Sequence, residues 1–376
     1  MSPDTFTETT KIGFGSSIGG SFKGIFFGLL LFLASFVVIY MNEGRVDKSE
    51  IAKNAVQVNA SVLESHDDLQ GALVAAIGIF KTDDLIGDGE YLVSGNYLAV
   101  SRNVETYTWV EKVTSKTEDK LGGSQEVTKT YNYVKEWTSS PADSGSFKIP
   151  AEHENKITSI KSISTKAPNG MLGVYKVDMK ALSLPGSAAL PLNTKNVQLP
   201  TYGEIVNGKY IYIGDSSMND PVVGDVRISY SVTESDRETT VFAKLNGDKL
   251  GPYLDKKTDK TLYEARRTGL EESVTAMHGE YRVWLWALRV IGFLMMWMGL
   301  ASILGPISVL LSVIPALGSI GGSITRGVTF IIALVLSIVV ILISMLFHNL
   351  LVLILLGVAG VGAAVWFVKG KMGKSK

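Results

Sequence analysis

The sequence contains no cysteine and only four histidines, His66, His153, His278 and His348. Without thiols the chain can form neither disulfide bonds nor thiolate metal sites, and it has no cysteine nucleophile. The histidines are scattered, and no two of them have the i, i+4 spacing of a helical metal site. We therefore expect no metal site and no cofactor.

Familiar catalytic motifs are also missing. The stretch GFGSSIGG (13–20) lacks the lysine of a phosphate-binding loop and leads into an apolar segment, so we expect a flexible linker there. The acidic stretch KTDDLIGDGE (81–90) does not place its oxygens at calcium-loop positions, which favours a solvated turn. There is no Ser-x-x-Lys motif and no serine nucleophile elbow. These absences favour a protein that is not an enzyme.

Charge is missing from long stretches of the chain. Residues 24–41 carry none, and Arg326 is the only charge from Val290 to Val368. A helix of 18 residues rises about 27 Å, enough to cross the core of a bilayer. The first apolar run is too long for a cleaved signal peptide, so we expect it to stay as an anchor. The sequence predicts four transmembrane helices, at 24–41, 283–304, 328–347 and 350–368.

The flanks of these spans predict their orientation. The tail at 369–376 has four lysines and no acid, which places the C-terminus in the cytoplasm. Four crossings then place residues 1–23 in the cytoplasm too, and residues 42–282 outside it. Residues 305–327 contain two prolines and form either an interfacial helix or a re-entrant segment on the cytoplasmic side. Because the spans are almost free of charge, an ion pathway is disfavoured.

Residues 42–282 hold 34 of the 36 acidic residues and read mainly as β-structure. Apolar residues alternate with polar ones from Val56 to Val62, which is typical of a strand. The expected fold class is α+β. Because residues 138–208 are rich in proline, this domain forms either one lobe or two. From Leu262 onward, one helical face is marked by Leu270, Val274, Met277 and Tyr281, so one continuous helix should run from the domain into the second span. Further strands are predicted at 73–80, at 97–113 and 127–137 as a long hairpin, and at 209–213, 225–233 and 239–245, the last of these ending in an Asn-Gly turn.

Two residue patterns suggest contacts. On the second arm of the hairpin, Tyr131, Tyr133 and Trp137 occupy alternating positions, where they either pack across strands or bind a sugar or lipid. Small residues four apart allow helices to approach closely, within one chain or between subunits. They are Gly20, Gly24 and Gly28 around the first span, and Ala359 with Ala363 and Gly360 with Ala364 in the last.

Over nearly its whole length the chain resembles the LUMA family, also called the transmembrane protein 43 family, through four motifs that occur in the family's order. They are NEGR (Asn42, Glu43, Gly44, Arg45), VETYTWVE (104–111), YNYVKEW (131–137), and PVVGDVRISY (221–230) with Pro221, Gly224, Asp225 and Arg227. The resemblance implies one N-terminal span, a large exported domain and three C-terminal spans. It also implies a role in organising membrane-protein complexes in the endoplasmic reticulum and inner nuclear membrane, with lamins and emerin as partners.

The absence of cysteine and the lysine tail favour a bacterial member in the inner membrane, with a periplasmic domain. We expect Gly224 to make a tight turn, Asp225 to cap it and Arg227 to pair with an acid on a neighbouring strand, with a binding site as the alternative. The NEGR motif is expected to form a collar at the membrane exit, in which Glu43 and Arg45 meet the domain or lipid head groups.

The function expected is a non-enzymatic membrane scaffold that self-associates. Its expected partners are membrane lipids, a second copy of the chain and, by family resemblance, other membrane proteins, but not nucleic acid. The alternative function is a membrane-anchored sensor that binds a lipid or envelope ligand, and a deep apolar pocket would favour it.

Overall fold

A computed structural model describes residues 4–62, 67–120, 124–305 and 318–348. The chain is an α+β protein that divides into two compact units. We call them the β unit (Met1–Thr7, Asp47–Thr114 and Lys129–Gly279) and the helical unit (Glu8–Val46, Ser115–Thr128 and Glu280–Lys376). Most of the domain predicted between the first two spans is therefore one compact unit.

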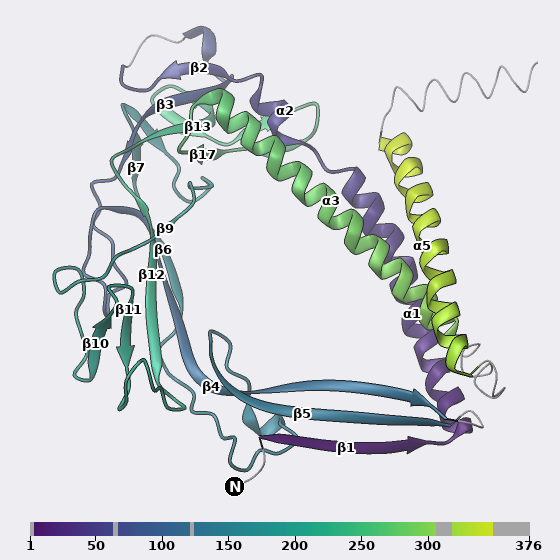
Figure 1. The fold of residues 1–376 in the computed structure, drawn as a ribbon. Helices are drawn as coiled ribbons and strands as arrows, with labels where there is room; N and C mark the ends of the chain where they lie inside the picture. The colour runs from purple at the N-terminus through teal and green to yellow at the C-terminus, as the bar shows by residue number, and fades with distance from the viewer. Residues whose placement is uncertain (1–3, 63–66, 121–123, 306–317, 349–376) are drawn as a thin grey trace, which may run out of the picture. The chain divides into compact units, whose positions relative to one another are not determined.

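The first sheet has the strand order β1-β5-β4-β12-β11-β10 (Figure 1). β4 and β5 are neighbours and form the predicted long hairpin. Along β12 the side chains of Val226, Ile228, Tyr230 and Val232 are buried, every second residue, as a strand with one covered face requires. The strands are β1 (Thr5–Ile12), β4 (Tyr97–Asp119), β5 (Gln125–Thr138), β10 (Gly203–Val206), β11 (Tyr210–Ile213) and β12 (Val226–Glu234), with β6 (Ile163–Lys166) beside β4 and β9 (Ala188–Ala189) beside β12.

The second sheet has the order β17-β13-β14-β8-β7-β3-β2, and β13 also pairs with β3. β3 and β13 run antiparallel, from Leu73 opposite Lys244 to Phe80 opposite Arg237. The predicted turn follows β13, where Gly247 has a φ of +60°. The strands are β2 (Val56–Asn59), β3 (Leu73–Lys81), β7 (Gly170–Leu172), β8 (Tyr175–Val177), β13 (Arg237–Asn246), β14 (Lys249–Gly251) and β17 (Glu264–Arg266); β15 (Tyr253–Asp255) and β16 (Lys260–Leu262) pair separately.

Both sheets contribute to one hydrophobic core. Phe80 of β3 and Leu98 of β4 are fully buried in the same cluster. The proline-rich region adds Leu172, Tyr175 and Met179 to it, each no more than 2% exposed. This region therefore belongs to the core and does not separate two lobes. Besides its short strands it contains the 3-10 turn η2 (Ser144–Ser146), and a second turn, η1 (Asp67–Leu69), precedes β3.

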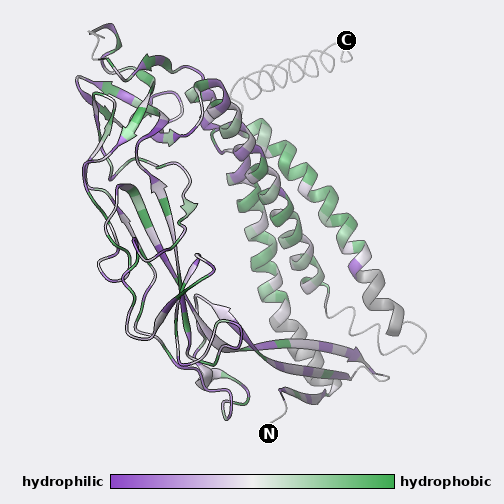
Figure 2. Cartoon of the chain, turned by 60° about the vertical axis from the view of Figure 1, so that its left-hand side comes forward, coloured by the Kyte–Doolittle hydropathy of each residue, from purple (hydrophilic) through white to green (hydrophobic). Residues whose placement is uncertain are grey.

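Three long helices carry the apolar segments: α1 (Phe14–Glu43), α3 (Leu270–Ile303) and α5 (Gly318–His348). Each has an apolar window long enough to cross a membrane, and Figure 2 shows the hydrophobic residues concentrated on them. α3 is the predicted continuous helix, but it begins at Leu270 and not near Leu262, because Lys260–Leu262 and Glu264–Arg266 are strands. The short α2 (Lys48–Ala52) belongs to the β unit. The predicted fourth span, 350–368, lies outside the described residues.

The N-terminal segment differs from its prediction. Residues 14–20, expected as a flexible linker, are the first turns of α1, and Thr5–Ile12 form β1 at the edge of the first sheet. The Tyr133 amide donates to the Asp4 carbonyl at 2.7 Å, and Thr5 donates to Asn132 at 3.0 Å. Of the predicted interfacial segment 305–327, residues 306–317 lie outside the described part, and Gly318 begins α5.

Candidate functional site

The C-terminal end of α1 is a polar junction between helices of the helical unit. Asn42 donates from Nδ2 to the Leu285 carbonyl of α3 at 2.9 Å. Glu43 accepts two hydrogen bonds from Arg289 of α3, one from Nε and one from a terminal guanidinium nitrogen, each at 2.8 Å. The side chains of Glu43 and Arg289 are only 4% and 13% exposed. Such a buried, two-pronged ion pair fixes the register of the two helices. Sequence analysis did not single out Arg289.

The other two residues of the NEGR motif complete this junction. Gly44 lies against His348 at the end of α5, so that a Cβ at this position would collide with the imidazole ring. His348 also packs on Tyr40, with ring centroids 4.5 Å apart. The carbonyl of Arg45 accepts a hydrogen bond from Tyr281 at 3.4 Å. We call Asn42–Arg45 with Leu285, Arg289 and His348 the collar; it joins all three described long helices.

Below the collar, α1 and α3 pack through glycine. A Cβ on Gly28 would lie 2.7 Å from the Cβ of Ser302 and 2.8 Å from the Gly299 carbonyl oxygen. A Cβ on Gly292 would lie 2.5 Å from Cγ1 of Ile39. Both distances are too short for a real side chain, so these glycines permit the close helix approach.

The predicted helix-packing residues thus fall into separate groups. Gly28 packs within the chain, whereas at Gly24 no atom from the described part of the chain lies within 4 Å of a built Cβ. Gly20 lies in α1, in a part whose side chains are not described. Gly360 and Ala364, with Ala359 and Ala363, lie outside the described residues. Of the predicted helix-packing glycines whose surroundings are described, Gly24 is therefore the one with open space beside it, a property that it shares with Gly279 of α3 and Gly327 of α5.

In the PVVGDVR motif, Asp225 is a buried acceptor. Its Oδ2 accepts from the Tyr212 hydroxyl at 2.5 Å, from Ser216 at 2.6 Å and from the Val222 amide at 2.7 Å. Burial, and then the bond to Asp225, raise the pKa of Tyr212 to about 12. Gly224 has a φ of +106° in the turn just before it, and Pro221 is the first residue of the motif. This carboxylate fastens the turn to β11.

Arg227 of the same motif is held on three sides. Its Nε donates to Glu105 at 2.7 Å, and the two residues are directly opposite on β12 and β4. Its guanidinium carbon lies 4.7 Å from the centroid of the Trp137 ring and 4.8 Å from that of Tyr210. A cation between two aromatic faces beside an acid is a strong structural contact.

The aromatic residues of the hairpin pack against one another and against the loop after it. Trp137 meets Tyr107 across the hairpin, with ring centroids 5.3 Å apart. Tyr131 and Tyr133 are buried in a small cluster with Phe147. Tyr133 also stacks on His153, at 3.9 Å between centroids, and donates to Glu111 at 2.8 Å. Cross-strand packing therefore accounts for this row without a ligand.

One polar cluster was not foreseen. Asp88, placed by the sequence in a solvated turn, has a fully buried side chain that accepts from Arg102 at 2.8 Å and from the Tyr230 hydroxyl. Burial raises the pKa of Asp88, but the bonds from Tyr230 and from the amides of residues 90–92 outweigh it, so its pKa lies below the ordinary value. The position of Arg102 could have revealed this cluster. Side chains at every second position of β4 point inward, and Arg102 follows the buried Leu98 and Val100 in this alternation, so its charge needs a buried acid as partner.

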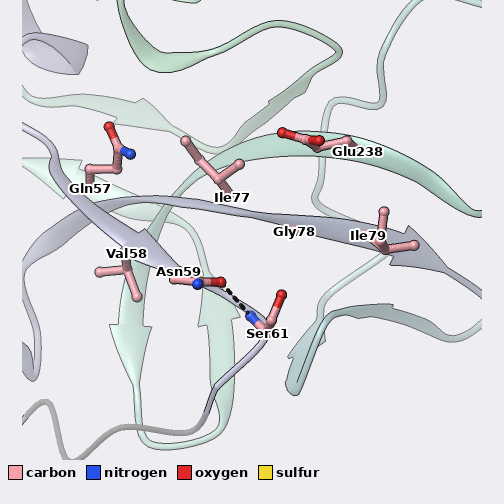
Figure 3. A pocket seen from close by; sticks show the side chains of 8 residues that line it. All are labelled: Gln57, Val58, Asn59, Ser61, Ile77, Gly78, Ile79 and Glu238. Carbon is pink, nitrogen blue, oxygen red and sulfur yellow. Dashed lines mark hydrogen bonds between the residues drawn. The ribbon is translucent and has the colours of Figure 1, made fainter.

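The β unit has an open groove of about 660 Å³ over strands β2, β3 and β13 (Figure 3). Ile77 and Ile79 supply apolar surface, while Gln57 and Glu238 supply polar groups, so the lining is mixed. This groove is not the deep apolar pocket that a lipid sensor requires. The lining residues are Gln57, Val58, Asn59, Ser61, Ile77, Gly78, Ile79 and Glu238.

Comparison with known proteins gives a consistent result. The model of the family "Transmembrane protein 43" matches residues 106–350. The mouse protein of that name is 30% identical over 78% of this chain and 76% of its own length, and the rat protein is 29% identical over the same shares. The "Transmembrane protein 43 homolog" of Drosophila melanogaster is 24% identical over 91% of this chain and 93% of its own. No solved structure matches.

Proposed function

Because the chain belongs to the transmembrane protein 43 family, we propose that it is a non-enzymatic membrane scaffold that organises membrane-protein complexes or membrane structure. It acts through self-association in the membrane and through its β unit, and its partners are membrane lipids, a second copy and other membrane proteins. A helical unit with three candidate membrane spans supports this proposal.

The observation that carries the proposal is the open face of α1 at Gly24. The space beside Gly28, one turn further, is occupied by α3 of the same chain, but no atom of the described residues lies within 4 Å of a built Cβ at Gly24. Around it, Phe26, Phe27 and Leu30 are more than half exposed. In lipid, where no hydrophobic force drives helices together, such a glycine allows a second helix to approach closely.

The polar clusters of the β unit support a role without catalysis. Asp225, Arg227 and Asp88 each use their charge on neighbouring strands or turns of the same unit. A catalytic side chain must be accessible to a substrate in a cleft, whereas the charges of these three residues are engaged by neighbouring groups. The alternative, a sensor of lipid or envelope ligands, gains no support from the mixed groove of Figure 3.

For orientation, we propose that the β unit lies outside the cytoplasm and that the lysine tail lies inside, with 350–368 as a fourth span. The four lysines of the tail supply the excess of positive charge that is typical of the cytoplasmic side of a membrane protein. A bacterial inner membrane is the location expected from composition alone. The relatives reported above are animal proteins, so an animal endomembrane is the competing location.

Substitution at Gly24 tests self-association. Gly24→Ile should shift the detergent-purified protein to a smaller assembly in native mass spectrometry, because a branched side chain holds the helices apart. Its melting temperature should not fall, since no described atom of its own chain is displaced. Leu30→Ile, an exposed change of equal volume, is the control and should leave the mass unchanged. An unchanged mass for Gly24→Ile would contradict assembly through this face.

A further inference from the structure

Two exposed arginines lie just beyond the apolar segments of α1 and α3, at the collar end of the helical unit. Arg45 is the first charged residue after α1 ends, and Arg282 is the last exposed charge of α3, since Arg289 is buried against Glu43. Tyr281, the neighbour of Arg282, donates to the Arg45 carbonyl at 3.4 Å. The two arginines therefore lie at one level of the helical unit.

The charge of these two arginines is not neutralised within the described chain. No described carboxylate forms an ion pair with Arg45 or Arg282, whereas Arg289 is paired with Glu43. Glu280 is two positions before Arg282, and residues at i and i+2 of a helix do not face each other. Over residues 42–46 and 280–289 together there are three arginines and two glutamates. This end of the helical unit is therefore complementary to an anion.

Exposed aromatic side chains mark a membrane interface at the same level. Trp284 and Trp286 are each 57% exposed, and Tyr40 is 48% exposed. They lie in helices that are long and apolar enough to cross a membrane. Trp and Tyr are enriched where the hydrocarbon core meets the head groups. Arg282 is one turn from Trp286 on the same side of α3, toward the polar end, so Arg282 and Arg45 lie at the depth of the lipid phosphates.

We propose that Arg45, Arg282 and Trp286 bind the head group of an anionic phospholipid, in the leaflet at the collar end of the helical unit. The guanidinium groups bind the phosphate, because their planar donors match its oxygens in pairs. The Trp286 ring lies 4.8 Å from the guanidinium carbon of Arg289, which holds the indole in place beside the lipid. This inference rests on the proposed function, in which membrane lipids are partners, and adds which lipid binds and where.

The apolar surface beside the arginines favours a lipid over a soluble anion. Met41 and Val283, next to the collar in sequence, are 66% and 69% exposed. A soluble phosphate would leave both side chains uncovered, whereas the acyl chains of a lipid cover them. An arginine near an anionic membrane surface contributes about fivefold in affinity, so two arginines give about 25-fold.

Competition between two lipids in native mass spectrometry tests this site. The full-length protein in detergent is mixed with phosphatidylglycerol and phosphatidylcholine that have the same acyl chains, and the retained lipids are counted. We expect phosphatidylglycerol to be retained in preference by about 25-fold. Arg45→Gln and Arg282→Gln should each lower this preference about fivefold, and the double variant should have almost none.

Two controls separate the site from general attraction between charges. Arg326→Gln removes an exposed arginine near the start of α5, at the opposite end from His348 of the collar, and should keep the preference. Glycerol 1-phosphate carries the phosphate without acyl chains and should not displace phosphatidylglycerol. The melting temperatures of the arginine variants should not fall, since neither Arg45 nor Arg282 has a side-chain partner among the described residues.

Three results would each overturn the site. They are an equal preference in the unaltered protein and the double variant, a loss in Arg326→Gln as large as in Arg282→Gln, and displacement of the lipid by glycerol 1-phosphate. Self-association is read from the protein mass in the same spectra. A failure of the scaffold proposal is therefore seen separately from a failure of the lipid site.

Discussion

Asp225 and Asp88 are buried carboxylates whose charge is satisfied by several donors each. Three groups donate to Oδ2 of Asp225 alone. A hydrogen bond to a charged group contributes about 1.5–3 kcal/mol to stability, and a buried group left unpaired costs about 1–3 kcal/mol. At the residue scale, these two carboxylates therefore stabilise the folded β unit.

We predict that Asp225→Ala lowers the unfolding free energy by about 2–4 kcal/mol, because the Val222 amide loses its acceptor and the Tyr212 and Ser216 hydroxyls, which can then bond only to each other, lose one acceptor between them. Asp225→Asn keeps one oxygen for these donors and should cost less than half as much. Denaturant unfolding followed by circular dichroism measures both. A stable Asp225→Ala protein that has lost a bound ligand or partner would mean that the motif is a binding site.

For single residues, the sequence predicted contacts that follow from a local pattern but not contacts with distant strands. Arg227 could be expected to face an acid across the strands, but not to lie between Trp137 and Tyr210, because Tyr210 comes from a separate strand. Asp88 was placed in a solvated turn because its neighbours in sequence are acidic. Its true partners, Arg102 and Tyr230, are brought to it only by the sheet.

At the scale of elements, periodicity and charge predicted most strands and the apolar helices. The continuous α3 followed from an uninterrupted helical face beginning at Leu270. The collar was foreseen only as an exit from the membrane, because nothing in the sequence shows that Glu43 will meet Arg289. The N-terminal strand β1 was missed for a related reason: its partner β5 lies more than one hundred residues away.

The ion pair of the collar gives the element-scale prediction. Glu43→Gln or Arg289→Met alone should lower the unfolding free energy by about 3–5 kcal/mol, because each leaves one buried charge without its partner. The double variant Glu43→Leu/Arg289→Met should recover much of this loss, since no charge then stays buried. Thermal unfolding in detergent measures all three.

The control for that series is an exposed pair. Arg237 and Glu234 are 63% and 50% exposed, so Arg237→Met should change stability by less than about 1 kcal/mol. Single variants at the collar that melt like the unaltered protein would show that solvent screens Glu43 and Arg289, and that the glycine contacts alone hold α1 against α3.

For the whole molecule, the question is on which side of the membrane the N-terminus lies. Residues 4–7 belong to the β unit, where Asp4 and Thr5 bond to β5. The β unit resumes at Asp47, after α1. A helix that crosses the membrane has its two ends on opposite sides, so pairing of β1 with β5 and a crossing by α1 exclude each other.

The magnitudes favour the crossing. Residues 24–41 include twelve Leu, Ile, Phe and Val residues, which gain about 0.3–0.6 kcal/mol each in a bilayer, or about 4–7 kcal/mol together. Cross-strand pairs contribute about 0.2–1 kcal/mol each, and the side chains of β1 that meet β5 are mostly exposed threonines. α1 also packs on α3 from Gly28 to Glu43, so a crossing by one of these helices requires a crossing by the other.

We therefore predict that β1 pairs with β5 in detergent but separates from it in a membrane. The Oγ1 atoms of Thr7 and Thr130 lie 3.4 Å apart, so cysteines at both positions should form a disulfide in detergent and remain free in sealed vesicles. The chain has no other cysteine to interfere. In separate sealed vesicles, each holding one single-cysteine variant, an impermeant maleimide added on the extracytoplasmic side should label Ser140→Cys but neither Ser2→Cys nor Ser375→Cys. A disulfide in vesicles together with external labelling at Ser2 would show that α1 begins and ends on one side; labelling at Ser375 would instead put the lysine tail outside and remove the four-span arrangement.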